Sequence, residues 1–509
     1  MRIGVGQVNT LVGDLEGNLE RLADAARRLA GLGAELIVFP EMAVPGYPPR
    51  DILCDDGFVA ATLRVTEDLA ARCAGLPPVL VGTIARAAER PPRHPGLHDV
   101  AALLEGGRVR TQIAKRLLPA YDVFHEPRWF LPGGPQAPLE IAGRRVGVLV
   151  CEDFWDAGYA VHPPDELRAA GAEVLVCLSA SPFRKGVFEE RLAHARQAAL
   201  PVVYVNAVGG QDELIFDGRS FVTDASGHLA QRLPGFAEEL AVVELGAPGP
   251  EPPAEDELDV LHHALVLGIR DFARKNRLER AVLGLSGGVD SALVARLAAE
   301  ALGPSQVTGA ALPSRYSDPR STQAARELAQ ALGIGFEVLG IEALHAAAEK
   351  ALPALLDAGT AGRLADENVQ ARLRMLVLMA LVNRRGGLLL NTSNKTELSL
   401  GYSTLYGDMS GALSPLGDVT KPEVYALARR LGGFPNFILE RPPSAELRPG
   451  QVDPFDYPLV GPRLEELVSS HRSDAALRRS EHKRWQMGVV LKVSRTAFGS
   501  GRLVPITRR

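Results

Sequence analysis

An apolar run that ends in a glycine-rich turn is the most constraining feature of this sequence. Residues 281–285 (AVLGL) are typical of a buried parallel strand, and residues 291–298 (SALVARLA) have helical periodicity. The turn between them contains two adjacent glycines, which allow a sharp bend and a close approach of the backbone to a ligand. A strand, a tight turn and a helix N-terminus in succession predict an anion site, because free amides and the helix dipole favour negative charge.

The residues of this turn indicate pyrophosphate together with a divalent cation. A P-loop would have a lysine before its last serine, whereas Asp290 stands there in this chain. A carboxylate at that position suits a magnesium ion held by oxygen ligands. An ordinary glycine turn with a serine N-cap is the alternative. The motif Ser-Gly-Gly-Val-Asp-Ser resembles the pyrophosphatase loop of ATP-dependent synthetases, which implies that ATP is bound by Gly284, Leu285, Ser286, Gly287, Gly288, Val289, Asp290 and Ser291.

The composition favours an enzyme with small-molecule substrates. At roughly 100–200 residues per domain, a chain of 509 residues allows two to four domains. A net charge of −5 without long charged runs argues against nucleic-acid or membrane partners. The four cysteines show no CxxC spacing, so neither a zinc site nor a disulfide framework is indicated. The chain starts on a strand-like segment and has no membrane-spanning run, and we expect a soluble cytoplasmic protein.

Two α/β halves are separated by a proline-rich stretch. Residues 1–245 alternate short β-rich runs, such as 101–104, 174–178 and 202–205, with helical stretches, such as 189–199, which predicts an α/β domain. Residues 246–257 (GAPGPEPPAEDE) have the composition of an exposed, semi-rigid linker. Residues 258–509 begin with a helix and continue with strands and helices in a doubly wound, parallel-sheet pattern.

Three chemically capable side chains follow strands of the N-terminal half. Glu41 follows the strand at 36–39, Lys115 follows residues 109–114, and Cys151 ends the run 146–150. Strand ends are where α/β sheets place active sites. Taken singly, each is more often a surface charge or a small core residue. Together, the stretches FPEMAVPGYPPRD (39–51), KRLLPAYDVFHE (115–126) and VCEDFW (150–155) resemble the nitrilase, or carbon–nitrogen hydrolase, superfamily and in particular its glutaminase branch.

This resemblance implies an α/β/β/α sandwich that hydrolyses glutamine. Cys151 would be the nucleophile, Glu41 the general base, and Lys115 the cation that stabilises the oxyanion. Such a set is needed because a free cysteine is only slightly ionised near neutral pH and a carboxamide is unreactive. The glutamine-binding residues that the resemblance implies are Tyr121, Glu126 and Ser181.

Two positions near the expected glutamine site, Glu126 and residue 187, have alternative interpretations. Glu126 would be a buried partner of Lys115, with a plain surface carboxylate as the alternative. The family usually has a basic residue after a glycine near the glutamine site, but Val187 stands there in this chain. Arg184 or Lys185 are the substitutes that the sequence offers.

Downstream stretches narrow the second substrate. They resemble NAD synthetase in order and spacing, and comprise residues 312–317 (LPSRYS), 367–374 (ENVQARLR), 391–397 (NTSNKTE), 401–408 (GYSTLYGD), 443–447 (PSAEL) and 482–484 (HKR). Together with the N-terminal motifs they make the chain similar to the glutamine-dependent NAD(+) synthetase family along nearly its whole length. Residues 456–463 (DYPLVGPR) are the exception, because the family's signature is not clear there.

The resemblance also implies the residues of this second site. ATP would be bound by Thr392, Lys421 and Ser444 in addition to the loop, deamido-NAD(+) by Asn368, Arg372, Glu397, Asp408 and Lys483, and Mg²⁺ by Asp290 and Glu397. Caps and surface charges are the alternatives for each position. The spacing agrees with the resemblance, since Asn368 and Arg372 are four residues apart and share a helix face.

These residues lead to one expected reaction and two alternatives. ATP would adenylate the carboxylate of deamido-NAD(+), and ammonia from glutamine would pass inside the protein to the acyl-adenylate, giving NAD(+), AMP, pyrophosphate and glutamate. By family resemblance the assembly would be a homo-oligomer, an octamer. The alternatives are an ATP-pyrophosphatase amidotransferase with another acceptor and a non-catalytic glutamine or nucleotide sensor.

Overall fold

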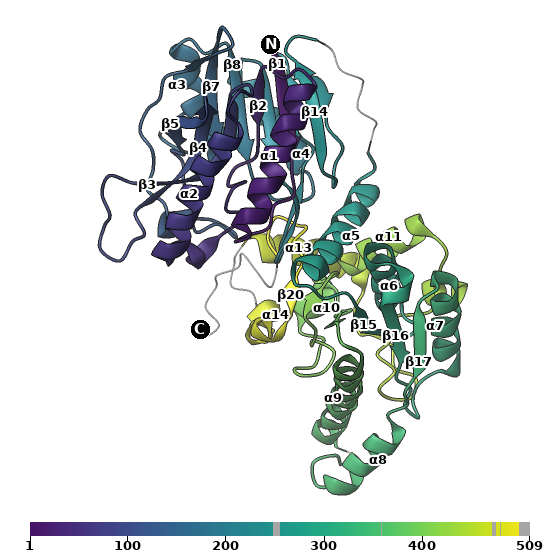
Figure 1. Cartoon of the computed structure of the whole chain (residues 1–509). Helices are drawn as coiled ribbons and strands as arrows, with labels where there is room; N and C mark the ends of the chain where they lie inside the picture. Colours follow the sequence, from purple (N-terminus) through teal and green to yellow (C-terminus); the bar gives the residue numbers. More distant parts are fainter. Residues whose placement is uncertain (248–254, 358, 471–474, 479, 498–509) are drawn as a thin grey trace. The chain divides into compact units, whose positions relative to one another are not determined.

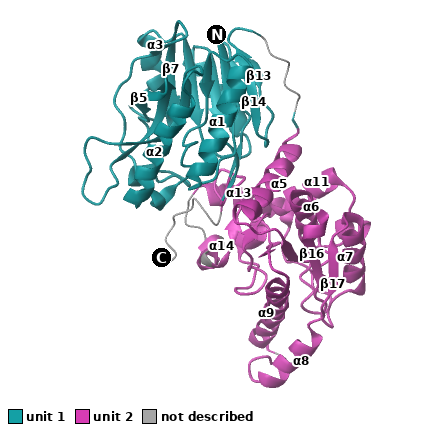
Figure 2. Ribbon diagram, in the orientation of Figure 1, with its two compact units in different colours: residues 1–211, 215–255 teal, residues 212–214, 256–509 magenta. Residues whose placement is uncertain are grey.

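The chain divides into two units in a computed structural model that describes residues 1–247, 255–357, 359–470, 475–478 and 480–497. Unit 1 comprises residues 1–211 and 215–255, and unit 2 comprises residues 212–214 and 256–509 (Figure 2). The predicted linker at 246–257 has residues 248–254 outside the described residues. All four cysteines are free thiols. Among the described helices, none has the length and apolar character needed to cross a membrane.

Unit 1 contains two six-stranded sheets (Figure 1). The first has the order β14 (Glu239–Glu244), β1 (Arg2–Gln7), β2 (Leu36–Val38), β3 (Val79–Arg86), β4 (Leu97–Glu105) and β5 (Arg108–Ala114). The second has the order β13 (Leu229–Arg232), β12 (Phe221–Thr223), β9 (Val202–Asn206), β8 (Val174–Ser179), β7 (Arg144–Val150) and β6 (Leu139–Ile141). In each sheet three central strands are parallel, and a hairpin of β10 (Val208–Gln211) and β11 (Leu214–Asp217) lies outside both.

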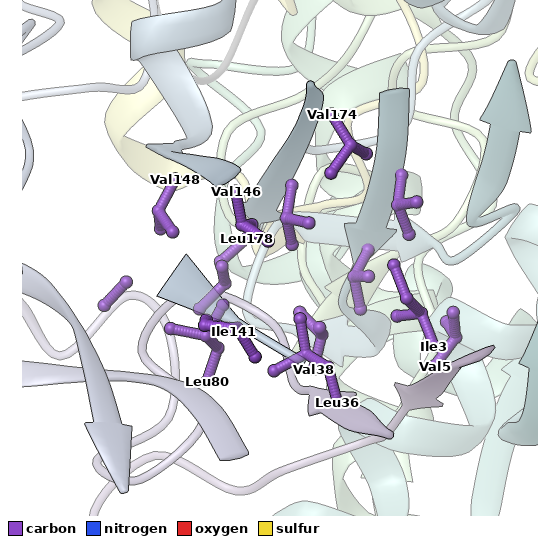
Figure 3. Close-up of a cluster of buried hydrophobic side chains, with 14 of the residues drawn as sticks. Ile3, Val5, Leu36, Val38, Leu80, Ile141, Val146, Val148, Val174 and Leu178 are labelled. Atoms are coloured by element: carbon purple, nitrogen blue, oxygen red, sulfur yellow. The ribbon is translucent and has the colours of Figure 1, made fainter. Parts of the chain in front are cut away.

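The core of unit 1 lies between these sheets. Alternate side chains of both sheets are buried against one another, such as Val38 and Leu80 of the first and Val146 and Val174 of the second (Figure 3). Helices α1 (Leu15–Gly31) and α2 (Asp56–Arg72) cover the outer face of the first sheet. Helices α3 (Pro163–Ala169) and α4 (Val187–Ala198) cover that of the second. The predicted α/β/β/α sandwich is therefore confirmed.

Unit 2 is built on a four-stranded parallel sheet with the order β17 (Gly335–Val338), β16 (Val307–Ala311), β15 (Ala281–Gly284) and β18 (Leu388–Leu389). The chain moves from β15 to one side for two strands and then returns to the other side, as in a doubly wound fold. Ligands bind at such a switch point, beyond the carboxyl ends of the strands. The predicted doubly wound parallel sheet is confirmed.

The helices of unit 2 connect and surround this sheet. They are α5 (Glu257–Lys275), α6 (Val289–Leu302), α7 (Pro319–Leu332), α8 (Glu342–Ala351), α9 (Thr360–Arg385), α10 (Lys395–Leu400), α11 (Lys421–Leu431), α12 (Asn436–Glu440), α13 (Tyr457–Ser469) and α14 (Ala475–Arg478). Short strands β19 (Leu413–Ser414) and β20 (Val489–Val490) form a separate parallel pair. The glycine-rich turn connects β15 to α6, with Gly288 as the N-cap residue.

Candidate active sites

Cys151 lies directly after β7, at the start of a 3₁₀ turn (Cys151–Phe154). Its φ of +43° is in the left-handed region, which non-glycine residues seldom adopt. The hydroxyl of Ser179, at the end of β8, donates to Sγ at 3.3 Å. Burial and the nearby charge of Glu41 raise the pKa of the Cys151 thiol well above its usual range. The resting group is therefore a neutral thiol that needs a proton acceptor to react.

Glu41 and Lys115 form a buried pair beside this thiol. Lys115 Nζ lies 2.6 Å from Glu41 Oε1 and 2.9 Å from Glu126 Oε1, and the backbone N–H of Ala180 donates to Glu41 Oε2 at 2.8 Å. Burial pushes the pKa of Glu41 upward, but Lys115 and hydrogen bonds, one of them with Cys151, bring it below its usual value. Glu41 is therefore an ionised acceptor within reach of the thiol.

The lysine keeps its charge in this setting. Burial alone would lower the pKa of Lys115, but the negative charges of Glu126 and Glu41 raise it well above its usual value. Burial raises the pKa of Glu126 to about 7, although Lys115 partly offsets the effect. Lys115 is completely buried and Glu126 is 3% exposed, so Glu126 is not a surface carboxylate.

Glu152 is a site residue that our sequence reasoning missed. It accepts hydrogen bonds from the hydroxyls of Tyr121 at 3.0 Å and Tyr159 at 2.9 Å. Burial raises the pKa of its carboxyl to about 7. Its position directly after Cys151 in the motif VCEDFW was the available signal. A carboxylate and two tyrosine hydroxyls thus lie next to the nucleophile.

Ser181 is held by a buried ion pair. Arg191 Nη2 donates to Ser181 Oγ at 3.1 Å, and Arg191 Nη1 contacts both oxygens of Asp217 at 3.0 Å. Val187, the residue that replaces the expected cation, is only 2% exposed at the start of α4. Arg184, one of the proposed substitutes, forms an ion pair with Glu190.

A cavity of about 290 Å³ lies at the switch point of unit 2. Seven of the eight predicted loop residues line it, together with Thr392, Glu397, Asp408, Lys421 and Ser444. Gly287 is the eighth loop residue, and it shapes the turn. Its φ is +76°, and a Cβ there would lie 2.5 Å from the carbonyl oxygen of Ser321, so only glycine fits.

Two acidic side chains of this cavity hold one lysine between them. Lys421 Nζ lies 2.5 Å from Asp290 Oδ2 and 3.1 Å from Glu397 Oε1, and Asn394 donates to Asp290 Oδ1 at 2.8 Å. Burial raises the pKa of Glu397 to about 7, against the effect of Lys421. Asp290 and Glu397 offer carboxylate oxygens, the ligand type that Mg²⁺ prefers, and the ammonium of Lys421 lies between them.

Asn368, Arg372 and Lys483 are not among the described residues that line the cavity, and all three contact the segment 401–408. Thr404 donates to Asn368 Oδ1 at 2.7 Å, Arg372 donates to the carbonyl of residue 405 at 3.1 Å, and Lys483 donates to that of residue 401 at 2.8 Å. Asp408, at the end of this segment, does line the cavity. Asn368, Arg372 and Lys483 therefore contact a segment that contributes to one wall of the cavity.

Two arginines of the cavity were missed from the sequence. Burial lowers the pKa of Arg374 to about 10, and its Nε donates to the carbonyl of Leu312 at 3.1 Å. Arg441 donates to Ser321 Oγ at 2.6 Å and pairs with Glu446 at 3.0 Å. Arg374 was inside a quoted motif, but the direction of its side chain depends on how α9 packs. Both arginines suit an anionic ligand.

Comparison with known proteins agrees with this two-part geometry. Residues 2–248 match the carbon–nitrogen hydrolase family and residues 261–496 match the NAD synthase family. A glutamine-dependent NAD(+) synthetase of Synechocystis sp. is 38% identical, covering 99% of this chain and 98% of the relative. The one of Rhodobacter capsulatus is 36% identical, covering 100% and 98%. The structure of the Acinetobacter baumannii enzyme in complex with ADP covers 99% of this chain and 98% of its own, with a TM-score of 0.81 at 29% identity.

Proposed function

This chain belongs to the family of glutamine-dependent NAD(+) synthetases, and we propose on that basis that it amidates deamido-NAD(+) to NAD(+) with ammonia from glutamine. The single observation that supports this best is the buried set of Cys151, Glu41 and Lys115, because such a set suits amide hydrolysis. The same chain also contains the cavity of unit 2, whose loop residues suit a nucleotide. An amidotransferase with another acceptor would share both sites, and the experiment below distinguishes the two.

In the proposed glutaminase reaction, Glu41 takes the proton of Cys151 as sulfur attacks the side-chain carbonyl carbon of glutamine. The oxygen of the tetrahedral intermediate becomes negative, and the ammonium of Lys115 stabilises it. Glu41 then returns the proton to the leaving ammonia, which leaves a thioester on Cys151. Water, deprotonated by Glu41, hydrolyses the thioester to glutamate. The distance of 2.6 Å between Lys115 Nζ and Glu41 Oε1 supports this proposal, in which Glu41 transfers the proton and Lys115 stabilises the oxyanion at the same place.

Glutamine recognition is proposed to use Glu152 and Ser181. The α-ammonium group of glutamine needs a negative partner, and the carboxylate of Glu152 is buried beside the nucleophile. Tyr121 and Tyr159 orient this carboxylate through their hydroxyls. The loop around Ser181 is held by Arg191, and it offers polar groups for the opposite end of the amino acid. This assignment leaves Val187 outside the recognition set.

In unit 2 we propose that a carboxylate oxygen of deamido-NAD(+) attacks the α-phosphorus of ATP and releases pyrophosphate. Amides of the loop at 284–291 and the N-terminus of α6 would hold the phosphates. Asp290 and Glu397 would hold Mg²⁺, which neutralises phosphate charge when it is bound. Lys421 would then contact phosphate oxygens, and ammonia would displace AMP from the acyl-adenylate to give NAD(+).

Three further features belong to this proposal. Ammonia would pass through the protein interior, because ammonium in water is not nucleophilic. Exposed apolar side chains on α9, Leu364, Leu376 and Met379, support a homo-oligomer, with an octamer as the expected form. A cytoplasmic location would keep Cys151 a reduced thiol.

The decisive experiment measures NAD(+) formation from deamido-NAD(+) and MgATP with either glutamine or ammonium. Cys151→Ala should lose the glutamine-driven reaction and keep the ammonium-driven one, whereas the exposed Cys54→Ala should keep both. If the wild type cleaves ATP but forms no NAD(+) from either nitrogen source, the acceptor is another molecule and the proposed function is wrong.

A further inference from the structure

Asp99 is a buried carboxyl that the mechanism above does not use. It lies on β4, where Asp99, Ala101 and Leu103 alternate on one face. Ala101 and Leu103 belong to the core between the two sheets, so Asp99 lies on the inner face of the sandwich. It is 1% exposed. An ionisable group in such a position is costly unless it is paired or neutral.

The surroundings of Asp99 offer it no donor of its own. Neither carboxyl oxygen receives a hydrogen bond from any described residue. The nearest cation is Lys115, whose Nζ is 3.6 Å from Asp99 Oδ2 but only 2.6 Å from Glu41 and 2.8 Å from Glu126. Lys115 therefore pairs with the two glutamates more closely than with Asp99. The backbone N–H of Lys115 also donates to the carbonyl oxygen of Asp99 at 2.8 Å, which fixes the two residues together.

The charges at this place do not balance if every acid is ionised. Oxygens of Glu41, Asp99 and Glu126 lie within 4.8 Å of one another around the single ammonium of Lys115. Three carboxylates and one ammonium would leave two negative charges on buried side chains, so proton retention is favoured. Burial and the charge of Glu41 raise the pKa of Asp99 well above its usual value, whereas the pKa of Glu41 is lowered.

We propose that Asp99 is a positioning residue of the glutaminase site, which retains its proton and donates it in a hydrogen bond to Glu41. In this arrangement Asp99 is a neutral donor, and Glu41 stays an ionised acceptor for the proton of Cys151. Asp99 acts through Glu41, on which Asp99, Lys115 and the amide of Ala180 converge.

Among the described residues, the titratable groups that interact with Glu41 include Tyr47, Asp99, Lys115, Glu126, Cys151, Glu152 and Cys177. Tyr47 donates to Glu126 at 3.1 Å and not to Glu41. Lys115 serves both glutamates. Of the carboxyl groups in this cluster, Asp99 is therefore the one that donates its proton in a hydrogen bond to Glu41.

The test compares Asp99→Asn, which keeps a neutral donor of the same shape, with Asp99→Leu, which removes it. Glutamate release is measured against pH, and a thermal unfolding scan of each variant reports folding. Asp99→Asn should stay within about threefold of wild type with the same acidic limb in kcat/KM. Asp99→Leu should lose about 10- to 100-fold in kcat with little change in KM, because a hydrogen bond to a charged group is lost. Its acidic limb should move up by about one pH unit.

The infrared difference spectrum of wild type minus Asp99→Asn gives a readout that needs no substrate. It should show the carbonyl band of a protonated carboxyl near neutral pH. The absence of that band, or an acidic limb of Asp99→Asn that moves to lower pH, would mean that Asp99 is ionised and would overturn the inference. The inference rests on the proposed glutaminase reaction. If wild type does not hydrolyse glutamine, that reaction is wrong, whereas the infrared band still decides the protonation of Asp99.

Discussion

The ammonium of Lys421 lies 2.5 Å from the carboxylate of Asp290, inside the cavity of unit 2. The variant Lys421→Met leaves Asp290 and Glu397 facing each other without this cation, and removes the proposed phosphate contact. We expect ammonium-driven NAD(+) formation to fall by about 100-fold or more. Lys350→Met, on the exposed side of α8, should match wild type. A thermal unfolding scan separates this effect from loss of structure, and a decrease below threefold would contradict the proposed role.

The hydroxyl of Ser179 should promote the reactivity of Cys151. In Ser179→Ala the thiolate loses a donor, and we expect kcat/KM for glutamine to fall by about tenfold or more. Alkylation of Cys151 by iodoacetamide should slow in parallel, measured in a Cys54→Ala background. Tyr204→Phe removes the 2.6 Å partner of Ser179 and leaves the bond to sulfur in place, so it should react nearly normally. Equal losses in both variants would show that the effect is structural.

Glutamine binding should depend on the charge of Glu152. Burial raises the pKa of this carboxyl to about 7, so lowering the pH through that value protonates it and removes the proposed partner of the substrate's α-ammonium. KM for glutamine should therefore rise as pH falls below about 7. Glu152→Gln should have a high KM that no longer varies in this range. Glu140→Gln, an exposed change on β6, should keep the wild-type profile. A flat wild-type KM would refute the assignment.

The turn after β15 should tolerate a methyl group at one glycine and not at its neighbour. Gly287→Ala forces a positive φ on alanine and places Cβ 2.5 Å from the Ser321 carbonyl, costing about 1–3 kcal/mol or more. Gly288→Ala meets only the Ser286 hydroxyl at 3.3 Å and has a φ of −94°. We expect the thermal stability to fall in the first variant and to stay near that of wild type in the second. Similar behaviour of the two would contradict this reading of the turn.

Local patterns in the sequence predicted much of the fold. The apolar runs at 174–178 and 202–205 correspond to β8 and β9, and the turn at 286–290 connects β15 to α6 as expected. The helix expected at 189–199 starts two residues earlier, because Gly186 takes a left-handed φ and ends the preceding loop. These features depend on residues close in sequence, which is why pattern reading reaches them.

The site was less accessible to sequence reasoning. The roles of Cys151 and of the cavity residues stay predictions, even though the structure brings their side chains together. Asp99 escaped notice because the strand expected at 101–104 is only the apolar middle of β4. Its burial arises when two sheets close on each other, and no local pattern records that. Arg374 escaped for a similar reason, since the packing of α9 decides which of its arginines faces the cavity.

The left-handed φ of Cys151 has an evolutionary consequence. Glycine adopts a φ of +43° without the cost of about 1–3 kcal/mol that other residues incur. Relief of backbone strain would therefore favour glycine at position 151, whereas the proposed nitrogen transfer requires the thiol. The two pressures oppose each other at a single residue. A descendant that no longer uses glutamine would be expected to drift towards glycine there, because losing the thiol would then relieve backbone strain without affecting the proposed reaction.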